Sequence, residues 1–192
     1  TDCGSNYETI LDKYYQYDDS LHNELTNLRA KINNLEDLKN FSNETKSLEK
    51  KITIFHAEVV KKILKEKDVE IDFIGFHGQT IYHNADKRIS KQLGDGKLLS
   101  QLSRKKVIND FRKNDIKNGG QGAPLTPLFH SMLACKFNLV PSIILNIGGI
   151  INATTISENG SFLATDIGPG MCLIDKWIRL KSKKRYDENG DI

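Results

Sequence analysis

The spacing of apolar residues changes near residue 70, and this change limits the folds open to the chain. Before it, the sequence is rich in Lys, Glu, Asn and Leu and contains no Pro. Apolar residues recur there at steps of three and four, which places them in one stripe on a helix. This stripe consists of Leu21, Leu25, Leu28, Ile32 and Leu35.

A second helix is predicted from Asn43 to Lys67, with Ser42 or Asn43 as its N-cap. Its apolar stripe consists of Leu48, Ile52, Phe55, Val59, Val60, Ile63 and Leu64. The two segments together predict a helical hairpin over residues 19–67 that packs on the rest of the domain. A coiled coil is the alternative, but the heptads are too few to favour it.

After residue 70, short apolar runs alternate with helical patterns and Gly-rich corners, which predicts an α/β architecture. Strands are predicted over residues 71–76, 107–111, 142–146, 151–157 and 161–165. The strands at 71–76 and 142–146 are predicted to be buried, and those at 151–157 and 161–165 to form a hairpin with its turn at residues 158–160. Helices are predicted over residues 97–103, 125–135 and 171–180, and a loop over residues 118–127.

Charge and composition exclude several classes of protein. The 192 residues carry 28 basic and 25 acidic side chains, and this net charge of +3 is too small to indicate nucleic acid or an anionic membrane surface. No apolar run approaches the length of a membrane span. The three Cys and five His lack the spacing of a disulfide framework or a metal site. We therefore expect no metal-binding cluster, and a reducing, cytoplasmic location.

Two Gly-containing segments follow predicted strands in the first part of the α/β region. His77, Gln79 and Thr80 come after the first strand, where residues often line a ligand crevice and where their donors and acceptors suit a sugar or an amide. A turn with His77 satisfied locally is the alternative. Asp110, Arg112 and Asp115 precede the loop at 119–125; these charges either hold that loop or bind a ligand hydroxyl.

Two further Gly corners lie near the end of the chain. Gly148 and Gly149 form a predicted hairpin turn whose backbone N–H groups are candidates to bind phosphate oxygens; a plain tight turn is the alternative. Asp166 precedes Gly168 and Gly170 at the end of an apolar strand, where a carboxylate is costly without a partner or a task. The following helix N-terminus suits an anion, although Asp166 as a cap of that helix is an alternative.

Taken together and in this order, these segments resemble the anhydro-N-acetylmuramic acid kinases of the sugar-kinase, Hsp70 and actin superfamily. The resemblance is firm over residues 70–190. The matching stretches are GFHGQTIYH (75–83), GDGKLLSQLS (94–103), VINDFRKND (107–115), GGQGAPLTPLFH (119–130), LNIGGIINAT (145–154) and ATDIGPGMCLIDKW (164–177).

The resemblance implies two α/β domains around a cleft that binds ATP, Mg²⁺ and 1,6-anhydro-N-acetylmuramic acid. It implies that Asp166 activates the water that opens the anhydro ring while the sugar O6 takes the γ-phosphoryl group. The product, N-acetylmuramic acid 6-phosphate, enters peptidoglycan recycling. The implied sugar-binding residues are His77, Gln79, Thr80, Asp110, Arg112 and Asp115. The implied nucleotide-facing residues are Gly148, Gly149, Asn152, Gly168 and Gly170.

The sequence also departs from the family pattern. Residues 1–5 do not match the Gly-Thr-Ser-x-Asp-Gly phosphate loop with which the family opens, and Met171 stands where the family usually has Asn. We expect residues 1–140 to be a partial first domain, with the helical hairpin at 19–67 and then the sugar-binding part. Residues 141–192 are expected to begin a second, nucleotide-facing domain that is truncated.

Two expectations follow from these departures. The chain alone is expected to be inactive, because phosphoryl transfer depends on positioning from both sides of the cleft. Apolar surface from Ile143 to Trp177 is expected to be uncovered, which points to a companion chain or a homodimer. The alternatives to a kinase fragment are a non-catalytic sugar-binding module and an interaction protein built on the helical hairpin.

Overall fold

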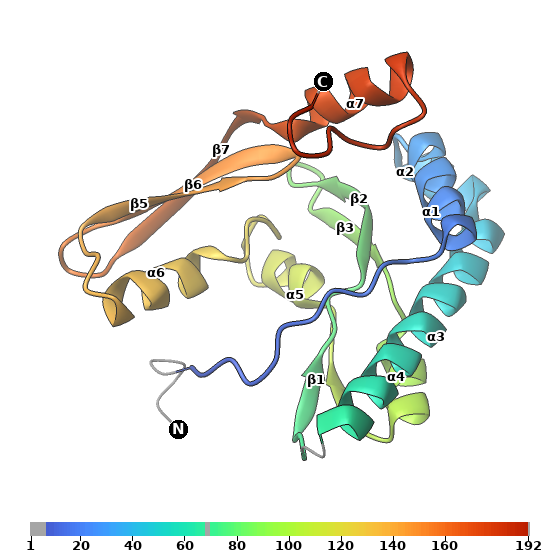
Figure 1. Ribbon diagram of the computed structural model, residues 1–192, viewed down its shortest axis with the longest axis horizontal. Coiled ribbons are helices and arrows are strands. Elements are labelled where there is room, and N and C mark those ends of the chain that lie inside the picture. The colour runs from blue at the N-terminus through green and yellow to red at the C-terminus, as the bar shows by residue number, and fades with distance from the viewer. Residues whose placement is uncertain (1–6, 68–69, 192) are drawn as a thin grey trace. The chain divides into compact units, whose positions relative to one another are not determined.

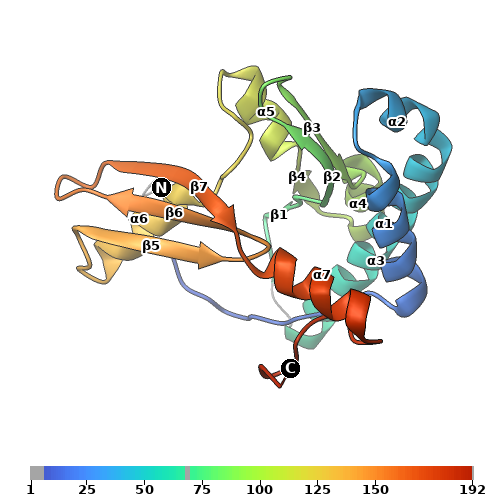
Figure 2. The same cartoon turned by 90° about the horizontal axis from the view of Figure 1, so that it is seen from above.

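The computed structural model describes residues 7–67 and 70–191. The described chain divides into two compact units (Figures 1 and 2). Leu11–Ala123 forms the first, here called the helical unit, and the residues from Pro124 onward, with those before Leu11, form the second, here called the sheet unit. Compact units and family domains are different divisions of a chain, so the domain boundary expected after residue 140 stays a prediction.

The helical unit begins with α1 (Asp19–Lys31), α2 (Leu35–Asn40) and α3 (Ser42–Lys67). The predicted second helix is confirmed, and it begins at Ser42. The prediction that one helix carries the stripe from Leu21 to Leu35 is wrong, because the backbone becomes extended at Ile32.

A capping box explains this break. The Asn34 side chain accepts hydrogen bonds from the backbone N–H groups of Glu36 and Asp37, at 2.8 and 3.0 Å. The Asp37 carboxylate in turn accepts from the N–H of Asn34. This reciprocal pair starts α2 and satisfies donors that a new helix leaves open. Local capping therefore overrides an apolar stripe that continues in phase across two helices.

The core of the helical unit lies between α1, α3 and a hairpin of two strands, β2 (Gln79–Asn84) and β3 (Ile89–Leu93). Its buried members are Leu21, Leu28, Ile32, Leu48, Ile52, Ile81 and Leu93. A second cluster joins Ala57 of α3 to Phe76 and to Leu99 of α4 (Gly96–Ser103). One helix, α3, thus contributes to both clusters.

Two very short strands run parallel in this unit, β1 (Phe73–Gly75) and β4 (Lys106–Ile108), followed by α5 (Phe111–Lys117). The predicted strands at 71–76 and 107–111 are therefore too long. The first is also not buried throughout, because Phe73 is 58% exposed. Among the described residues each of these strands pairs only with the other, and the pairing covers three residues of each strand. The chain then continues into the segments that carry His77 and Arg112.

The sheet unit consists of α6 (Pro127–Lys136), a three-stranded antiparallel sheet and α7 (Met171–Lys181). The strands are β5 (Ser142–Ile147), β6 (Ile150–Ile156) and β7 (Phe162–Pro169), with β6 in the centre (Figure 2). The predicted hairpin of β6 and β7 is confirmed. On one sheet face, His130 of α6 bonds the Thr154 hydroxyl across 2.8 Å, so α6 packs against that face.

The opposite face of this sheet is apolar and exposed. Ile143 and Leu163 flank Thr155 across the three strands, and residues adjacent along a strand point to opposite faces. The prediction that residues 142–146 form a buried strand is wrong, because Ile143 is 65% and Leu145 is 55% exposed.

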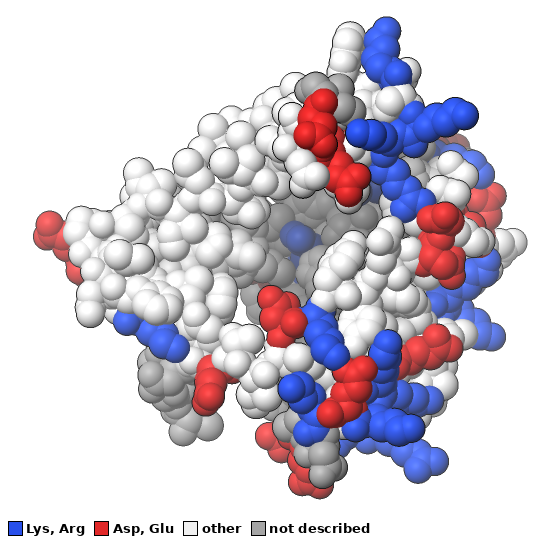
Figure 3. Space-filling view, viewed as in Figure 1, with Lys and Arg blue, Asp and Glu red and all other residues white. Residues whose placement is uncertain are grey.

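The expectation that apolar surface between Ile143 and Trp177 is uncovered is confirmed. Figure 3 shows a broad uncharged area over the sheet unit. The exposed apolar residues include Ile143, Leu145, Ile147, Ile150, Phe162, Leu163, Ile167, Met171, Leu173, Ile174 and Trp177. Among the described residues, no helix combines the length and apolar character needed to span a bilayer.

We predict that Ile52→Ala lowers the free energy of unfolding of the helical unit by roughly 2–5 kcal/mol, because it leaves a cavity at a fully buried position. Urea titration followed by circular dichroism measures this loss. Lys50→Ala on the exposed side of the same helix is the matched control and should change stability by less than about 0.5 kcal/mol. Equal losses in both variants would contradict the assigned core.

Candidate functional site

The parallel strands β1 and β4 bring His77 and Arg112 together at their carboxyl ends. Arg112 Nε donates a hydrogen bond to His77 Nε2 at 2.8 Å. An acceptor at Nε2 leaves the imidazole proton on Nδ1, and Nδ1 lies 2.8 Å from the Gly78 carbonyl oxygen that accepts it. Burial lowers the pKa of the half-buried Arg112 guanidinium from its usual value, and this side chain remains a cation. The pair therefore orients the imidazole at an exposed position.

Arg112 and Asp115 also hold the Gly-rich loop after α5. Arg112 Nη1 donates to the Gly122 carbonyl at 2.7 Å, and the Gly122 N–H donates to Asp115 Oδ2 at 2.7 Å. Gly120 passes close to the same carboxylate, because a Cβ at Gly120 would lie 2.1 Å from Asp115 Oδ2. Of the two interpretations left open by the sequence, holding the loop is confirmed for Arg112 and Asp115, which bond the Gly122 backbone, and not for Asp110. A role of these residues toward a ligand stays a prediction.

Asp110 lies outside this network. It has a left-handed backbone, with φ of 60°, at the start of α5, and its side chain makes no cap hydrogen bond. Its carboxylate is exposed and lies 3.8 Å from Lys113 Nζ. Neither Arg112 nor Asp115 therefore positions the Asp110 carboxylate, and its predicted contact with the sugar stays a prediction.

Gln79 and Thr80 are oriented by residues that the sequence analysis did not single out. Gln79 Nε2 donates to the Tyr17 hydroxyl at 3.3 Å, and Thr80 Oγ1 accepts from Gln92 Nε2 at 3.3 Å. Tyr17 packs edge-on against Phe55 of α3, with ring centroids 4.7 Å apart. Burial raises the pKa of the Tyr17 hydroxyl. Nothing in the sequence distinguishes Tyr17 from the nearby Tyr14 and Tyr15 as the residue that makes this contact.

In the sheet unit, Asp166 belongs to a polar row across all three strands. Asn146 of β5 lies opposite Asn152 of β6, and Asn152 lies opposite Asp166 of β7. Directly opposite residues share a sheet face, so the three side chains lie on the same side. β7 has one extra residue, Ile167, directly after Asp166. Asn146 was not a predicted site residue, and only the register brings it into the row.

Asn152 carries an unsatisfied group in this row. Its side-chain oxygen Oδ1 is buried and has no hydrogen-bond partner among the described residues. Buried polar atoms are usually paired, and an exception calls for an explanation such as a missing ligand or ion. Asp166, its neighbour in the row, is exposed. The row therefore combines an accessible carboxylate with an amide that lacks a partner.

The two Gly corners of the sheet unit contact each other. Gly148 and Gly149 form the β5–β6 turn, and their carbonyl oxygens accept from Met171 N and Gly170 N, each at 2.9 Å. These bonds occupy the first N–H groups of α7, so the prediction that this helix N-terminus suits an anion is wrong. The alternative that Asp166 caps α7 is also wrong, because α7 has no side-chain cap.

The glycines in these corners have different roles. A Cβ at Gly170 would lie 2.3 Å from the Gly148 carbonyl oxygen, so this position needs Gly for the turn itself. A Cβ at Gly148 or Gly149 would meet nothing closer than 3.7 or 3.9 Å, and one at Gly168 would meet nothing within 4 Å. These three positions therefore leave space beside the backbone that a ligand can approach.

Within residues 7–67 and 70–191, no group of three or more His, Cys, Asp or Glu side chains could hold a metal ion. A divalent cation at this chain would therefore take most of its ligands from elsewhere. Mg²⁺ in proteins usually keeps several waters and is bound by one or two carboxylates together with substrate phosphates.

The described chain is a mixed α/β protein in which polar residues and Gly corners follow short strands. The model of the anhydro-N-acetylmuramic acid kinase family matches residues 2–192. The chain belongs to this family, and with it to the sugar-kinase, Hsp70 and actin-like superfamily.

Curated relatives carry the same family description. The anhydro-N-acetylmuramic acid kinase of Pelagibacter ubique is 52% identical over 193 residues, which cover 99% of this chain and 52% of that protein. Those of Agrobacterium fabrum and Brucella canis are 45% and 42% identical over 150 and 151 residues, covering 74% and 76% of this chain and 40% of each relative. The chain thus spans about half the length of the curated relatives it matches.

We predict that Gly170→Ala destabilises the sheet unit by roughly 1–3 kcal/mol, because the added Cβ collides with a backbone carbonyl. Thermal unfolding measures the loss. Gly168→Ala, two residues earlier and with open space around it, is the matched control and should cost less. A loss in Gly168→Ala that equals or exceeds that in Gly170→Ala would exclude the assigned contact with Gly148.

A second prediction concerns the loop held by Asp115. Asp115→Ala removes the acceptor of the Gly122 N–H, and amide exchange at Gly122 should rise roughly tenfold or more, as expected for loss of a hydrogen bond to a charged group. The Gly120 N–H bonds the Asp115 main-chain oxygen and serves as an internal control. Unchanged exchange at Gly122 would show that the carboxylate does not hold the loop.

Proposed function

We propose that this chain takes part in the ATP-dependent conversion of 1,6-anhydro-N-acetylmuramic acid to N-acetylmuramic acid 6-phosphate, a step of peptidoglycan recycling. The family match over residues 2–192, with Asp166 inside its Gly-flanked motif, is the observation that carries this proposal. The named activity of the relatives supports it, although the chain spans about half of their length.

Asp166 is the proposed general base. Its exposed carboxylate takes a proton from the water that attacks the anhydro ring, the ring C–O6 bond breaks, and O6 becomes the acceptor of the phosphoryl group. Asn152, opposite Asp166 in the register, lies close enough along the sheet to orient the carboxylate or the water. The unpartnered Oδ1 of Asn152 supports a role for this amide toward a bound molecule.

The helical unit supplies the proposed sugar-binding groups. Arg112 contributes a fixed cation, and His77 contributes an imidazole that Arg112 and Gly78 orient. Gln79 donates through its nitrogen to Tyr17, which leaves its carbonyl oxygen to accept from a sugar hydroxyl or amide. Thr80, Asp110 and Asp115 complete this set.

The open Gly positions of the sheet unit fit a nucleotide. We assign Gly148, Gly149 and Gly168 to the approach of phosphate groups, and Asn152 to a polar contact beside them. Gly170 contributes by holding the turn. ATP, when bound with Mg²⁺, supplies the γ-phosphoryl group and the charge neutralisation that phosphoryl transfer needs.

A non-catalytic sugar-binding module is the second candidate function. It is favoured by one observation, namely that the contacts of Arg112 with His77 and Gly122 are complete within the helical unit. The exposed apolar face of the sheet unit supports a further element of the proposal, a companion chain or a second copy that covers it.

We predict that Asp166→Asn abolishes sugar-dependent ADP release and leaves sugar binding unchanged. The substitution removes the carboxylate that acts as base and keeps a side chain of nearly the same size and shape. ADP release is measured with ATP, Mg²⁺ and the anhydro sugar, for the chain alone and for the chain mixed with the part of the Pelagibacter ubique relative that it does not match. Binding is measured by calorimetry. The matched control is Glu158→Gln, the same charge change in the β6–β7 turn.

The expected result is sugar-dependent ADP release in the mixture, with none from the Asp166→Asn mixture and full release from the Glu158→Gln mixture. Sugar binding without ADP release in either sample would support the non-catalytic module. Equal release with Asp166 and with Asn at this position would reject Asp166 as the base, and absence of sugar binding would reject both functions.

A further inference from the structure

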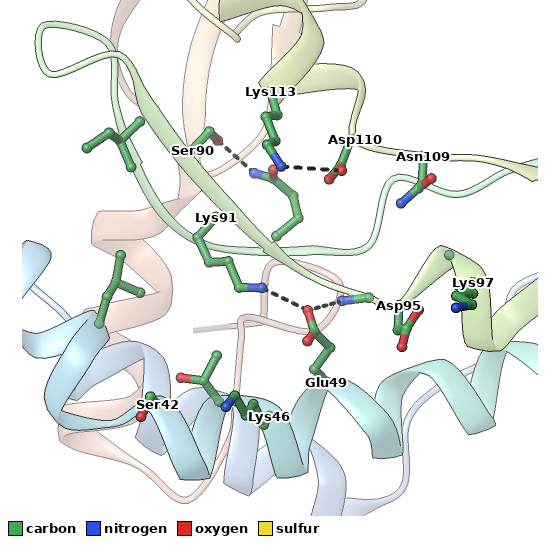
Figure 4. A pocket seen from close by; sticks show the side chains of 16 residues that line it. Ser42, Lys46, Glu49, Ser90, Lys91, Asp95, Lys97, Asn109, Asp110 and Lys113 are labelled. Atoms are coloured by element: carbon green, nitrogen blue, oxygen red, sulfur yellow. Dashed lines mark hydrogen bonds and ion pairs between the residues drawn. The ribbon is translucent and has the colours of Figure 1, made fainter. Parts of the chain in front are cut away.

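One cavity with charged and hydroxyl side chains in its wall lies wholly within the helical unit. Its volume is about 770 Å³, within the size range of small-molecule sites. It lies among α3, β3, the Gly94–Gly96 turn and the start of α5 (Figure 4). Of the residues predicted to bind the sugar, only Asp110 lines it. Neither the proposed reaction nor the family resemblance assigns a ligand to this cavity.

Four lysines from four different elements surround this cavity: Lys46 of α3, Lys91 of β3, Lys97 of α4 and Lys113 of α5 (Figure 4). Because they are distant in sequence and converge only in the fold, they are not one charged stripe on a solvated helix. The four ammonium groups outnumber the three carboxylates that also line this open cavity, those of Glu49, Asp95 and Asp110, which favours an anionic occupant.

The lysines differ in whether their charge is already balanced. Lys91 Nζ bonds Glu49 Oε1 at 2.8 Å, and that oxygen also accepts from Gly94 N at 3.3 Å. Lys113 lies 3.8 Å from Asp110. Lys46 and Lys97 form no ion pair within the described part of the chain. Two uncommitted positive charges match the charge of about −1.5 to −2 that a phosphate monoester carries near pH 7.

A buried hydroxyl in the wall points independently to a ligand. Thr45 lines the cavity and is 6% exposed, and its Oγ1 has no hydrogen-bond partner among the described residues. A buried hydroxyl without a partner is costly, and a bound polar group or water would satisfy it. The wall also offers Ser42, Ser90 and Asn109, which can bond the hydroxyls of a sugar.

We propose that this cavity binds a phosphorylated monosaccharide, with Lys46 and Lys97 on the phosphate group and the neutral polar groups of the wall on the sugar hydroxyls. The proposal goes beyond the proposed function and does not depend on it. The site is a binding site and no reaction is assigned to it.

Binding of glucose 6-phosphate, glucose and inorganic phosphate to the full chain tests this proposal, by calorimetry and by amide shifts in ¹⁵N-labelled protein. Glucose 6-phosphate should bind and shift amides of residues 42–49, 90–97 and 109–113. Inorganic phosphate should shift the same amides at higher concentration, and glucose should shift none. Lys46→Ala combined with Lys97→Ala should weaken glucose 6-phosphate binding at least tenfold.

Lys50→Ala combined with Lys61→Ala is the matched control, because it removes two exposed charges of α3 that do not line the cavity. It should leave the affinity unchanged, and circular dichroism of both double variants confirms that each is folded. Equal loss of glucose 6-phosphate affinity in both double variants would show that the loss comes from the change in net charge, and it would overturn the proposal. Amide shifts outside the cavity, or no binding of either phosphate, would also overturn it.

Discussion

One face of α3 holds the helical unit together. Ile52 is fully buried against α1 and the β2–β3 hairpin, and Thr53, one residue on, is equally buried. The Thr53 hydroxyl donates to the Glu49 carbonyl at 2.7 Å and accepts from Asp95 N at 3.0 Å. Glu49 itself bonds Lys91 and Gly94 N. Apolar packing and buried hydrogen bonds from one helix thus fix the turn at residues 94–96, and with it one wall of the lysine-lined cavity.

The sheet unit is organised by pairing rather than by a large core. The central strand β6 pairs on both sides, and the register of these pairs places Asn146, Asn152 and Asp166 in one row. α6 covers one face through Thr154, whereas the other face leaves its apolar residues exposed. Large apolar surfaces of this kind are rare on soluble monomers and mark interaction sites. Among the described residues this apolar face is exposed, whereas the polar row lies on the face that α6 shares.

Long periodic segments and tight turns could be predicted from the sequence, because their signals are local. The helix over residues 43–67 carries an apolar stripe that keeps its spacing from Leu48 to Leu64, and the β6–β7 hairpin has a Gly in its turn. The break at Ile32 was missed because the apolar stripe stays in phase into α2. Strand lengths at 71–76 and 107–111 were overestimated, because pairing depends on a partner strand that an apolar run does not reveal.

The sequence motifs predicted which residues are candidates for the site, but not which of these residues contact one another. The order of Gly and polar residues identified Asp166, His77 and Arg112 as candidates. The hydrogen bond from Arg112 to His77 joins residues 35 positions apart, and only the parallel pairing of β1 and β4 makes it possible. Tyr17 was not predicted because it acts through Gln79. Asn146 lies inside the stretch LNIGGIINAT but was not predicted as a site residue, because only strand register places it in the row. The lysine-lined cavity was missed for the same reason.

We propose that the two units have different roles, with the sugar-binding residues in the helical unit and the nucleotide-facing residues in the sheet unit. Separate titrations of ¹⁵N-labelled chain with 1,6-anhydro-N-acetylmuramic acid and with Mg²⁺-ADP test it most directly. The account predicts that the sugar shifts amides of residues 77–80 and 112–122, and that the nucleotide shifts those of residues 148–152 and 166–170. A sugar that leaves residues 77–80 and 112–122 unshifted, or a nucleotide that shifts these instead of the Gly corners, would contradict it.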